Sequence, residues 1–316
     1  MAATSPKMVQ AHRARRRSVL REIGRYKMGY VFLLPALLVL TFVDFVPMVQ
    51  GFLSSFHQYD LFRPFTDPWV GAQQYDALIH DPLFWRSLWQ TAYYTVASVI
   101  GQFLIGLAAA ALLNQSARLR GFFRGLVVIP WVVPGALAGV MFALLFTSTG
   151  LVNVVLSKLG IVGHLLPANY PWLSHGSTAM PVLIFTSAWK GFPFFTVMFL
   201  AAMQTVPREL YEAVKVDGAS PWKSFIHITL PGIRVTMLIA SLLGLIWTFN
   251  SLDLIYVMTS GGPYYATTTL VMYAYQQAFT NGQVGYATAI AMVIVVIMGL
   301  LTLFYLMLYR RAERAR

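Results

Sequence analysis

The sequence contains no cysteine. The chain can therefore form no disulfide, hold no metal through thiolates and use no cysteine nucleophile. Charged residues are scarce as well, at 11% of 316 residues, against about a quarter in an ordinary soluble domain. Because 58% of the residues are hydrophobic, much of this apolar surface has to face something other than water. These scarcities argue against a water-soluble globular domain.

The shortage of charge leaves long apolar runs. Residues 28–56 contain one charged side chain, and residues 235–252 and 284–309 contain none. A helix of about 20 apolar residues crosses a bilayer, whereas the strands of a membrane barrel are much shorter. We therefore predict an all-α fold, a polytopic membrane helix bundle. Its six expected spans are residues 28–54, 88–113, 122–146, 178–203, 233–258 and 283–309.

The basic residues that give the net charge of +12 are placed unevenly. They gather in a tail at 1–27, in the segments before the third and fifth spans, and in a second tail at 310–316. The positive-inside rule then places both tails and the segment 206–231 in the cytoplasm, on either side of a six-span domain at 28–309. An RNA-binding arm is the alternative explanation of the first tail, but membrane orientation accounts for all of the basic segments.

No phosphate-binding loop of the form G-x-x-x-x-G-K-[ST] occurs in the chain. The chain therefore does not hydrolyse ATP itself. We expect no catalytic residue, no metal site and no cofactor in it.

Several spans contain residues that bend helices or allow them to approach closely. Pro130 and Pro134 lie four residues apart in the third span, and each can kink a helix. Gly101 and Gly106 in the second span favour close helix packing. These features are typical of membrane bundles that rearrange.

Residues 206–231 are polar enough to leave the membrane, and their local chemistry predicts two short helices. Pro207 suits a first helical turn, and Gly218 can take the left-handed conformation that ends a helix. Ser220 followed by Pro221 predicts a second N-cap and first turn. We expect Pro231 to break the run before the fifth span.

The same segment carries a spaced pattern: Glu212-Ala213-Val214, then Gly218, then Ile228-x-Leu230-Pro231. This pattern resembles the EAA loop of membrane permease subunits in ATP-binding-cassette importers, E-A-A-x3-G-x9-I-x-L-P, with Val214 in place of the second alanine. An amphipathic hairpin lying in the membrane interface is the alternative. The resemblance implies that the loop docks on a separate ATPase subunit, which holds the ATP and Mg. The residues it assigns to this coupling are Glu209, Glu212, Ala213, Lys215, Asp217, Gly218, Ile228, Leu230 and Pro231.

A second set of motifs is similar to sugar permeases of the maltose and glycerol-phosphate type. The run 249–259 leads into Ser260-Gly261-Gly262-Pro263, and residues 34–36, 69–75 and 119–124 also match that branch. The resemblance implies a multi-pass protein of a prokaryotic plasma membrane that imports a carbohydrate. Its implied partners are a second permease subunit, two ATPase subunits and an external solute-binding protein.

Polar residues inside the spans mark a candidate substrate path, because an intramembrane charge costs several kcal/mol unless it faces a pathway or partner. Asn250 and Asp253 are three residues apart, which on a helix places them on one face. The candidate substrate-path residues are Asn250, Ser251, Asp253, Lys190, Phe194 and Thr288. A structural ion pair between Lys190 and Asp253 is the alternative reading of the two charges.

Other functions remain open at this point. A secondary transporter could relay protons through Asp253 and Lys190, although the EAA-like loop argues against it. A membrane enzyme acting on lipid-linked sugars would need paired carboxylates or a histidine cluster, which the chain does not show. The sequence does not name the solute, and glycerol-3-phosphate or another polar molecule is an alternative to a sugar.

Overall fold

The computed structural model describes residues 27–63, 67–115, 120–162, 166–167, 169–216 and 218–314. The chain divides into two compact units, residues 1–54 and 55–316, which are described separately. In the first unit, α2 (Lys27–Leu40), a π-helical turn (Thr41–Phe45) and α3 (Val46–Ser54) follow one another directly. Residues Val31–Ser54 are long and apolar enough to span a membrane. The predicted first span is thus a helix with one π turn in it.

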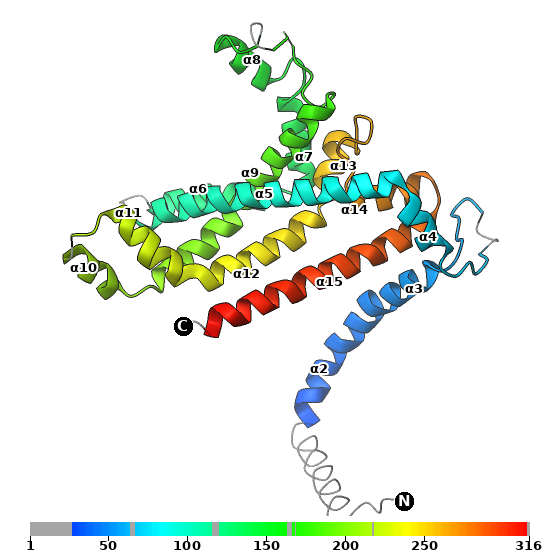
Figure 1. Cartoon of the computed structure of the whole chain (residues 1–316), viewed down its shortest axis with the longest axis horizontal. Helices are drawn as coiled ribbons and strands as arrows, with labels where there is room; N and C mark the ends of the chain where they lie inside the picture. The colour runs from blue at the N-terminus through cyan, green and yellow to red at the C-terminus, as the bar shows by residue number, and fades with distance from the viewer. Residues whose placement is uncertain are drawn as a thin grey trace, which may run out of the picture. The chain divides into compact units, whose positions relative to one another are not determined.

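The second unit is built on four long helices (Figure 1). They are α5 (Pro82–Asn114), α9 (Gly176–Gln204), α12 (Leu230–Phe249) and α15 (Val284–Arg314). Helix α12 packs against α5, α9 and α15. The most extensive contact joins α5 to α9, where a Cβ at Gly106 would lie only 2.5 Å from the Cβ of Phe195. The predicted close approach at Gly106 is therefore confirmed.

Asp81 ties the start of α5 to two other segments. Its side chain accepts a hydrogen bond from the N–H of Leu83, so it is the N-cap of the helix. The hydroxyls of Tyr273, in α14 (Leu270–Tyr275), and Tyr286, in α15, both donate to the same carboxylate oxygen. Burial opposes ionisation, but these hydrogen bonds outweigh it and lower the pKa of Asp81. One carboxylate thus fixes three helices at this end of the bundle.

The third span is broken. Helices α6 (Arg120–Val132) and α7 (Gly135–Leu145) meet at an angle of 92°. Pro134 is the N-cap of α7, and Pro130 lies inside α6. The predicted bend is confirmed at Pro134. The described residues contain five helices long and apolar enough to cross a membrane, or six when this bent pair counts as one span.

The fifth span differs from its prediction. We expected one helix over 233–258, but α12 ends at Phe249 and α13 (Asp253–Thr259) begins after a break. The side-chain amide of Asn250 donates to the backbone carbonyl of Ile246 at 2.8 Å. The backbone N–H of Asn250 bonds to the same carbonyl at 3.3 Å, and the N–H of Ser251 then bonds to the carbonyl of Thr248, only three residues back, so the α-helical pattern ends here.

Shorter elements complete the unit, and all of them are helical. They are α4 (Gln73–His80), α8 (Leu151–Lys158), α10 (Arg208–Val216), α11 (Pro221–Ser224) and the π-helical turns Phe225–Thr229 and Gln276–Thr280. Among the described residues, extended pairing is limited to isolated bridges such as Asp60 with Gln283. The all-α prediction is therefore confirmed.

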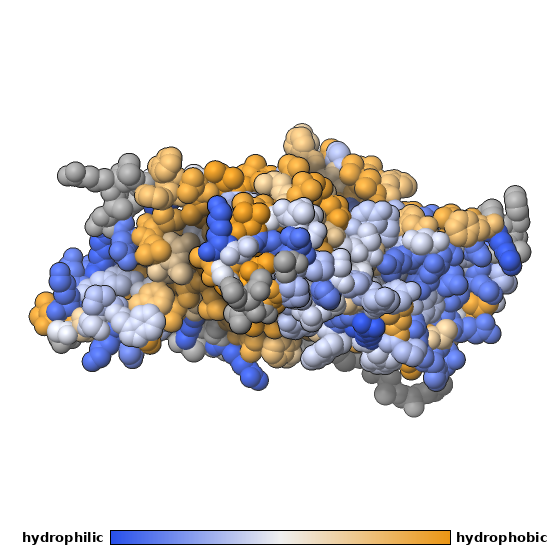
Figure 2. Space-filling view, turned by 90° about the horizontal axis from the view of Figure 1, so that it is seen from above, coloured by the Kyte–Doolittle hydropathy of each residue, from blue (hydrophilic) through white to orange (hydrophobic). Residues whose placement is uncertain are grey.

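The surface of the helices is apolar where a soluble protein would be polar. In Figure 2, hydrophobic residues gather in a broad band, and hydrophilic residues lie mostly toward the two ends of the view. Large side chains such as Leu104, Leu300 and Leu303 are more than half exposed. A band of this kind is what a helix bundle presents to the hydrocarbon of a bilayer.

Candidate coupling and translocation sites

Helix α10 presents its polar face away from the bundle. Glu209, Glu212 and Lys215 are exposed, and Ala213 is exposed beside them. On the opposite side, the Tyr211 hydroxyl lies 2.9 Å from Thr229 Oγ1, which joins α10 to the start of α12. The predicted coupling residues on α10 are thus accessible, while the helix itself is fixed from behind.

The turn after α10 follows the local prediction. Gly218 has φ +75°, and the N–H groups of Gly218 and Ala219 bond back to the carbonyls of Lys215 and Val214 at 3.2 and 3.1 Å. A Cβ at Gly218 would meet nothing within 4 Å, so the demand for glycine comes from the backbone alone. Ser220 then caps α11 by accepting from the N–H of Lys223. Asp217, also assigned to the coupling, lies outside the described residues.

The prediction that Pro231 breaks the helical run before the fifth span is wrong. Residues Pro221–Phe249 form one continuous helix, in which Pro231 stands at the start of the α12 segment. Proline supplies no N–H, and the π turn before it absorbs the mismatch: the N–H of Leu230 bonds to the carbonyl of Phe225, five residues back. Leu230 and Ile228 are half-buried, and Ile228 packs on the core formed by α5, α9 and α12.

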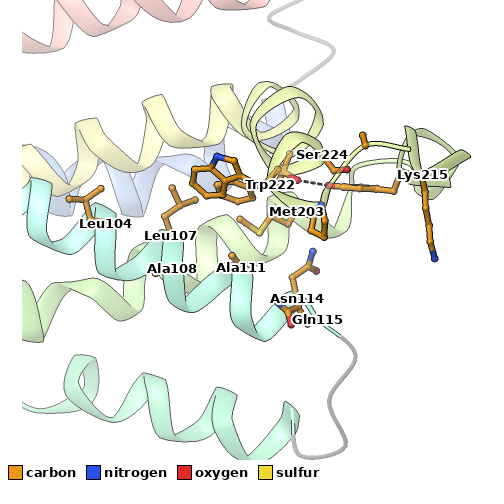
Figure 3. Close-up of a pocket in the computed structure, with 15 residues that line it drawn as sticks. Leu104, Leu107, Ala108, Ala111, Asn114, Gln115, Met203, Lys215, Trp222 and Ser224 are labelled. Carbon is orange, nitrogen blue, oxygen red and sulfur yellow. Dashed lines mark hydrogen bonds between the residues drawn. The ribbon is translucent and has the colours of Figure 1, made fainter. Parts of the chain in front are cut away.

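A groove of about 710 Å³ separates this segment from the end of α5 (Figure 3). Its apolar wall comes from α5, with Leu104, Leu107 and Ala111, and Trp222 closes it from the other side. Asn114 and Lys215 are polar members of its lining. Because Lys215 of α10 and Trp222 of α11 line the groove, movement of these two helices against α5 would change its width.

A second cavity lies where the broken spans meet. Its volume is about 130 Å³, and it combines three large aromatic rings with polar groups. Its lining residues are Gln102, Trp131, Ser187, Lys190, Gly191, Phe194, Gly244, Trp247, Thr248, Ser251, Asp253 and Leu254. Residues from α5, α6, α9, α12 and α13 therefore converge on one cavity, which is open to the surface of the chain because Trp131 and Trp247 are about half exposed.

Gln102 organises the polar side of this cavity. The residue is buried, and its Nε2 lies 3.2 Å from the Ser187 carbonyl, 3.3 Å from Ser187 Oγ and 3.4 Å from Thr248 Oγ1. A Cβ at Gly191 would lie 2.4 Å from the Gln102 amide carbon, so glycine makes room for this side chain. The amide thus links α5, α9 and α12.

The structure brings together four of the six predicted substrate-path residues. Lys190, Phe194, Ser251 and Asp253 line the cavity. Asn250 and Thr288 are not among its lining residues: Asn250 is bonded to its own helix, and Thr288 Oγ1 donates to the Gly285 carbonyl within α15. The expectation that Asn250 and Asp253 share one helix face is wrong, because α12 ends at Phe249 and Asp253 begins the separate helix α13.

Eight of the twelve lining residues were not among the predicted ones, and they include Gln102, Trp131 and Trp247. The signal for Gln102 was present, since it is the only amide within the apolar part of α5 from Thr91 to Leu113. The two tryptophans carried no such signal, because a tryptophan in a span is most simply read as an interfacial anchor. Phe194 packs against both, with ring centroids 6.3 Å from Trp131 and 4.8 Å from Trp247.

Lys190 and Asp253 do not form the ion pair that was one reading of the sequence. Within the described ranges, the ion pairs within 4.0 Å join His57 to Asp67 and His80 to Asp76. The Asp253 carboxylate is turned toward Ser251 and Gly135 instead.

Comparison with known proteins identifies the family. The family described as "Binding-protein-dependent transport system inner membrane component" matches residues 102–314. The chain belongs to this family. The permease is 33% identical over 293 residues to the sulfoquinovosyl glycerol transport system permease protein SmoG of Agrobacterium fabrum, covering 92% of this chain and 93% of that protein. It is 34% identical over 281 residues to the trehalose/maltose transport system permease protein MalF of Thermococcus litoralis, covering 89% and 92%.

Solved structures support the same fold. A bacterial ABC transporter involved in the import of the acidic polysaccharide alginate contains a chain that superposes with a TM-score of 0.79 at 23% identity. The match covers 93% of the permease and 99% of that chain. The helix bundle therefore has the fold of an ABC permease subunit, and the permease is a membrane protein.

Proposed function

We propose that the permease is the transmembrane subunit of an ATP-driven importer that moves a carbohydrate across the plasma membrane. The observation that carries the proposal is the cavity at the junction of the two broken spans. Irregular backbone inside a membrane bundle is tolerated where it lines a cavity, and such breaks mark binding sites in transporters. Trp131, Phe194 and Trp247 offer apolar faces for sugar rings, and Gln102, Ser187, Thr248 and Lys190 offer partners for hydroxyls.

The comparisons support a carbohydrate as the solute. The similar proteins named above act on a sulfoquinovosyl glycerol, on trehalose and maltose, and on alginate. A cavity of about 130 Å³ is smaller than the roughly 300–1,000 Å³ of most ligand pockets. A bound sugar would thus need this cavity to widen, as alternating access requires, or a second permease subunit to complete it.

Energy for transport would come from partner subunits. The permease contains no phosphate-binding loop, so ATP and Mg would bind to two separate ATPase subunits that dock on α10 and the turn at Gly218. An external solute-binding protein would deliver the sugar. A related solved complex of the alginate transporter includes an alginate pentasaccharide-bound periplasmic protein, which supports this assembly.

The proposed orientation places α10 and both chain ends in the cytoplasm, as the basic segments favour. Reporter tags after residue 2, near residue 218 and after residue 316 should be protected in intact cells, and tags near residues 67 and 265 should be accessible. An accessible tag near residue 218 would contradict both the orientation and the docking of an ATPase at this loop.

The decisive experiment is reconstitution of the permease with its second permease, ATPase and solute-binding protein in liposomes. Candidate carbohydrates should stimulate ATP hydrolysis and be taken up. Trp247→Leu should reduce uptake while assembly persists, and Trp89→Leu, at an exposed tryptophan outside the cavity lining, should not. If no carbohydrate were transported, or if both variants behaved alike, the assignment of the cavity to a sugar would be wrong.

One observation favours a second class of solute. Lys190 lines the cavity, and no carboxylate in the described part of the chain pairs with it. An anionic polyol such as glycerol-3-phosphate, or an acidic sugar, would supply the missing negative charge. Lys190→Met should then lower uptake of the anionic solute far more than uptake of a neutral sugar. A proton relay is less favoured, because it would need Lys190 and Asp253 to be connected.

A further inference from the structure

The carboxylate of Asp253 lies on the first residue of α7. A Cβ built on Gly135 would stand 1.6 Å from Asp253 Oδ2 and 2.6 Å from its carboxyl carbon. No side chain larger than hydrogen fits at position 135 while the carboxylate is in this place. Ser251 Oγ donates to the other oxygen, Oδ1, at 3.4 Å, which holds the carboxylate in this orientation.

The start of α7 is a suitable partner for a negative charge. Its N-cap is Pro134, which makes no side-chain cap, and the first intrahelical bond runs from the N–H of Ala138 to the carbonyl of Pro134. The N–H groups before Ala138 therefore lack helical acceptors, and the helix dipole is positive at this end. A carboxylate here stabilises a helix that begins inside the bundle, directly after a 92° bend.

A second contact continues the same interface. A Cβ at Gly139 would lie 3.2 Å from the Cβ of Val257 and 3.6 Å from the Leu254 carbonyl. Gly135 and Gly139 are four residues apart, as are Asp253 and Val257, so each pair shares one helix face. Small residues at this spacing let two helices approach closely in a membrane. Helices α7 and α13 are thus packed backbone to backbone along this face.

Both helices start directly after a break, α7 after residues 133–134 and α13 after residues 250–252. We propose that Asp253 is a positioning residue that fixes α7 to α13, so that these two half-spans move as one body against α6 and α12 during transport. This assignment rests on the proposed transport function. In this assignment Asp253 positions helices and does not bind substrate. Lys190 is then the charged residue of the cavity that can contact a solute.

The absence of native cysteine makes the proposal directly testable. The double variant Gly139→Cys/Val257→Cys places two thiols across the α7–α13 interface. Their Cβ atoms need to separate by a few tenths of an ångström from 3.2 Å to reach disulfide geometry. In the full reconstituted transporter we expect the disulfide to form equally well without nucleotide and in the ATP-bound state. The oxidised transporter should keep the ATP hydrolysis and uptake of the reduced one. Loss of uptake on oxidation, recovered on reduction, would show that α7 and α13 slide past each other and would overturn the proposal.

A second pair of variants decides the matter if the double-cysteine chain is inactive even when reduced. Gly135→Ala should displace the Asp253 carboxylate and lower uptake by roughly two- to fivefold, the scale expected for loss of an exposed charge–helix contact. Gly125→Ala is the matched control on α6, because a Cβ there meets nothing within 4 Å. Asp253→Ser, whose shorter side chain leaves room for the added methyl group and keeps a polar oxygen beside the start of α7, should restore most of the activity of Gly135→Ala when the two are combined. Equal activity of Gly135→Ala and Gly125→Ala, or no restoration by Asp253→Ser, would refute the positioning role.

These outcomes are separable from failure of the transport assignment. Disulfide formation with and without nucleotide is measured without any sugar, so it reports on the α7–α13 contact even if the solute is not a carbohydrate. A substrate ligand at Asp253 would behave differently. Asp253→Ser would then weaken solute affinity in a wild-type background and could not rescue Gly135→Ala.

Discussion

The turn at Gly218 offers a graded test of how the coupling segment is built. The residue has φ +75°, and a Cβ at this position would meet nothing within 4 Å. A substitution therefore introduces no clash with a neighbouring element, and its cost is the backbone strain of a left-handed residue. That strain is about 1–2 kcal/mol for an ordinary L-residue, less for asparagine, and greatest for β-branched residues.

Binding of the ATPase subunit and uptake should decrease from wild-type Gly218 through Gly218→Asn and Gly218→Ala to Gly218→Val. Because 1.4 kcal/mol is tenfold in an equilibrium, Gly218→Ala should reduce the population of correctly oriented α10 by roughly 5- to 30-fold if the strain is relieved by opening the turn. Gly218→Asn should stay close to wild type, since asparagine is the common alternative to glycine at this position of a helix end. Expression and thermal unfolding should change little, because the bundle core is remote from the turn.

The assay is binding of the ATPase subunit to the purified permease, measured together with uptake in liposomes. Gly125→Val is the control for adding a β-branched side chain at an open glycine with ordinary helical backbone. A result in which Asn and Val are equally damaging would refute the strain argument, and it would point to a close approach of the ATPase as the reason for glycine. If all three variants bound the ATPase normally, the turn would have no part in docking.

Three further predictions concern polar and charged side chains of the bundle. Gln102→Leu leaves Ser187 and Thr248 without the amide that now joins them, and a buried polar group deprived of its partner costs about 1–3 kcal/mol; uptake and thermal stability should both fall, and a variant with unchanged stability would contradict the bonding. The folded protein lowers the pKa of Asp81, so ionised Asp81 stabilises the fold at any pH above the ordinary aspartate pKa near 3.8. This stabilisation is lost as the pH falls through the lower pKa of the folded state. The difference in unfolding temperature between wild type and Asp81→Asn should therefore be full at pH 7 and shrink below about pH 4. Because Lys190 and Asp253 form no ion pair, Lys190→Met should not restore stability lost in Asp253→Asn, and restoration in a double-mutant cycle would show that the two charges are coupled.

Local chemistry predicted those parts of the permease that are determined by neighbouring residues. Long apolar runs indicated the spans, Pro134 indicated the bend, and Gly218 with Ser220 indicated the turn between α10 and α11. In each case the deciding interaction lies within a few residues of the chain, so it can be read without knowing the tertiary structure.

The errors have two origins: local interactions that no sequence pattern reveals, and tertiary packing. At the end of α12 the side chain of Asn250 bonds to its own helix, and an asparagine within an apolar run gives no sign of whether it will do so. Pro231 was expected to end a helix, and the π turn that accommodates it has no reliable sequence pattern. The cavity could not be assembled in advance, because Gln102, Trp131 and Trp247 come from three helices whose packing is a tertiary property.

The continuity of α12 through Pro231 bears on how the two candidate sites communicate. Residues Pro221–Phe249 form a single helix of 29 residues, which at 1.5 Å per residue is about 43 Å long. One end carries Trp222 and Phe225 beside α10, and the other carries Trp247 and Thr248 in the wall of the cavity. A helix interrupted at Pro231 would absorb a displacement of the coupling segment at that joint. An uninterrupted one tilts as a unit, so movement imposed at Trp222 reaches Trp247 and is taken up at the break after Phe249. In the proposed importer, that break is therefore where motion from the ATPase side becomes a change in the shape of the cavity.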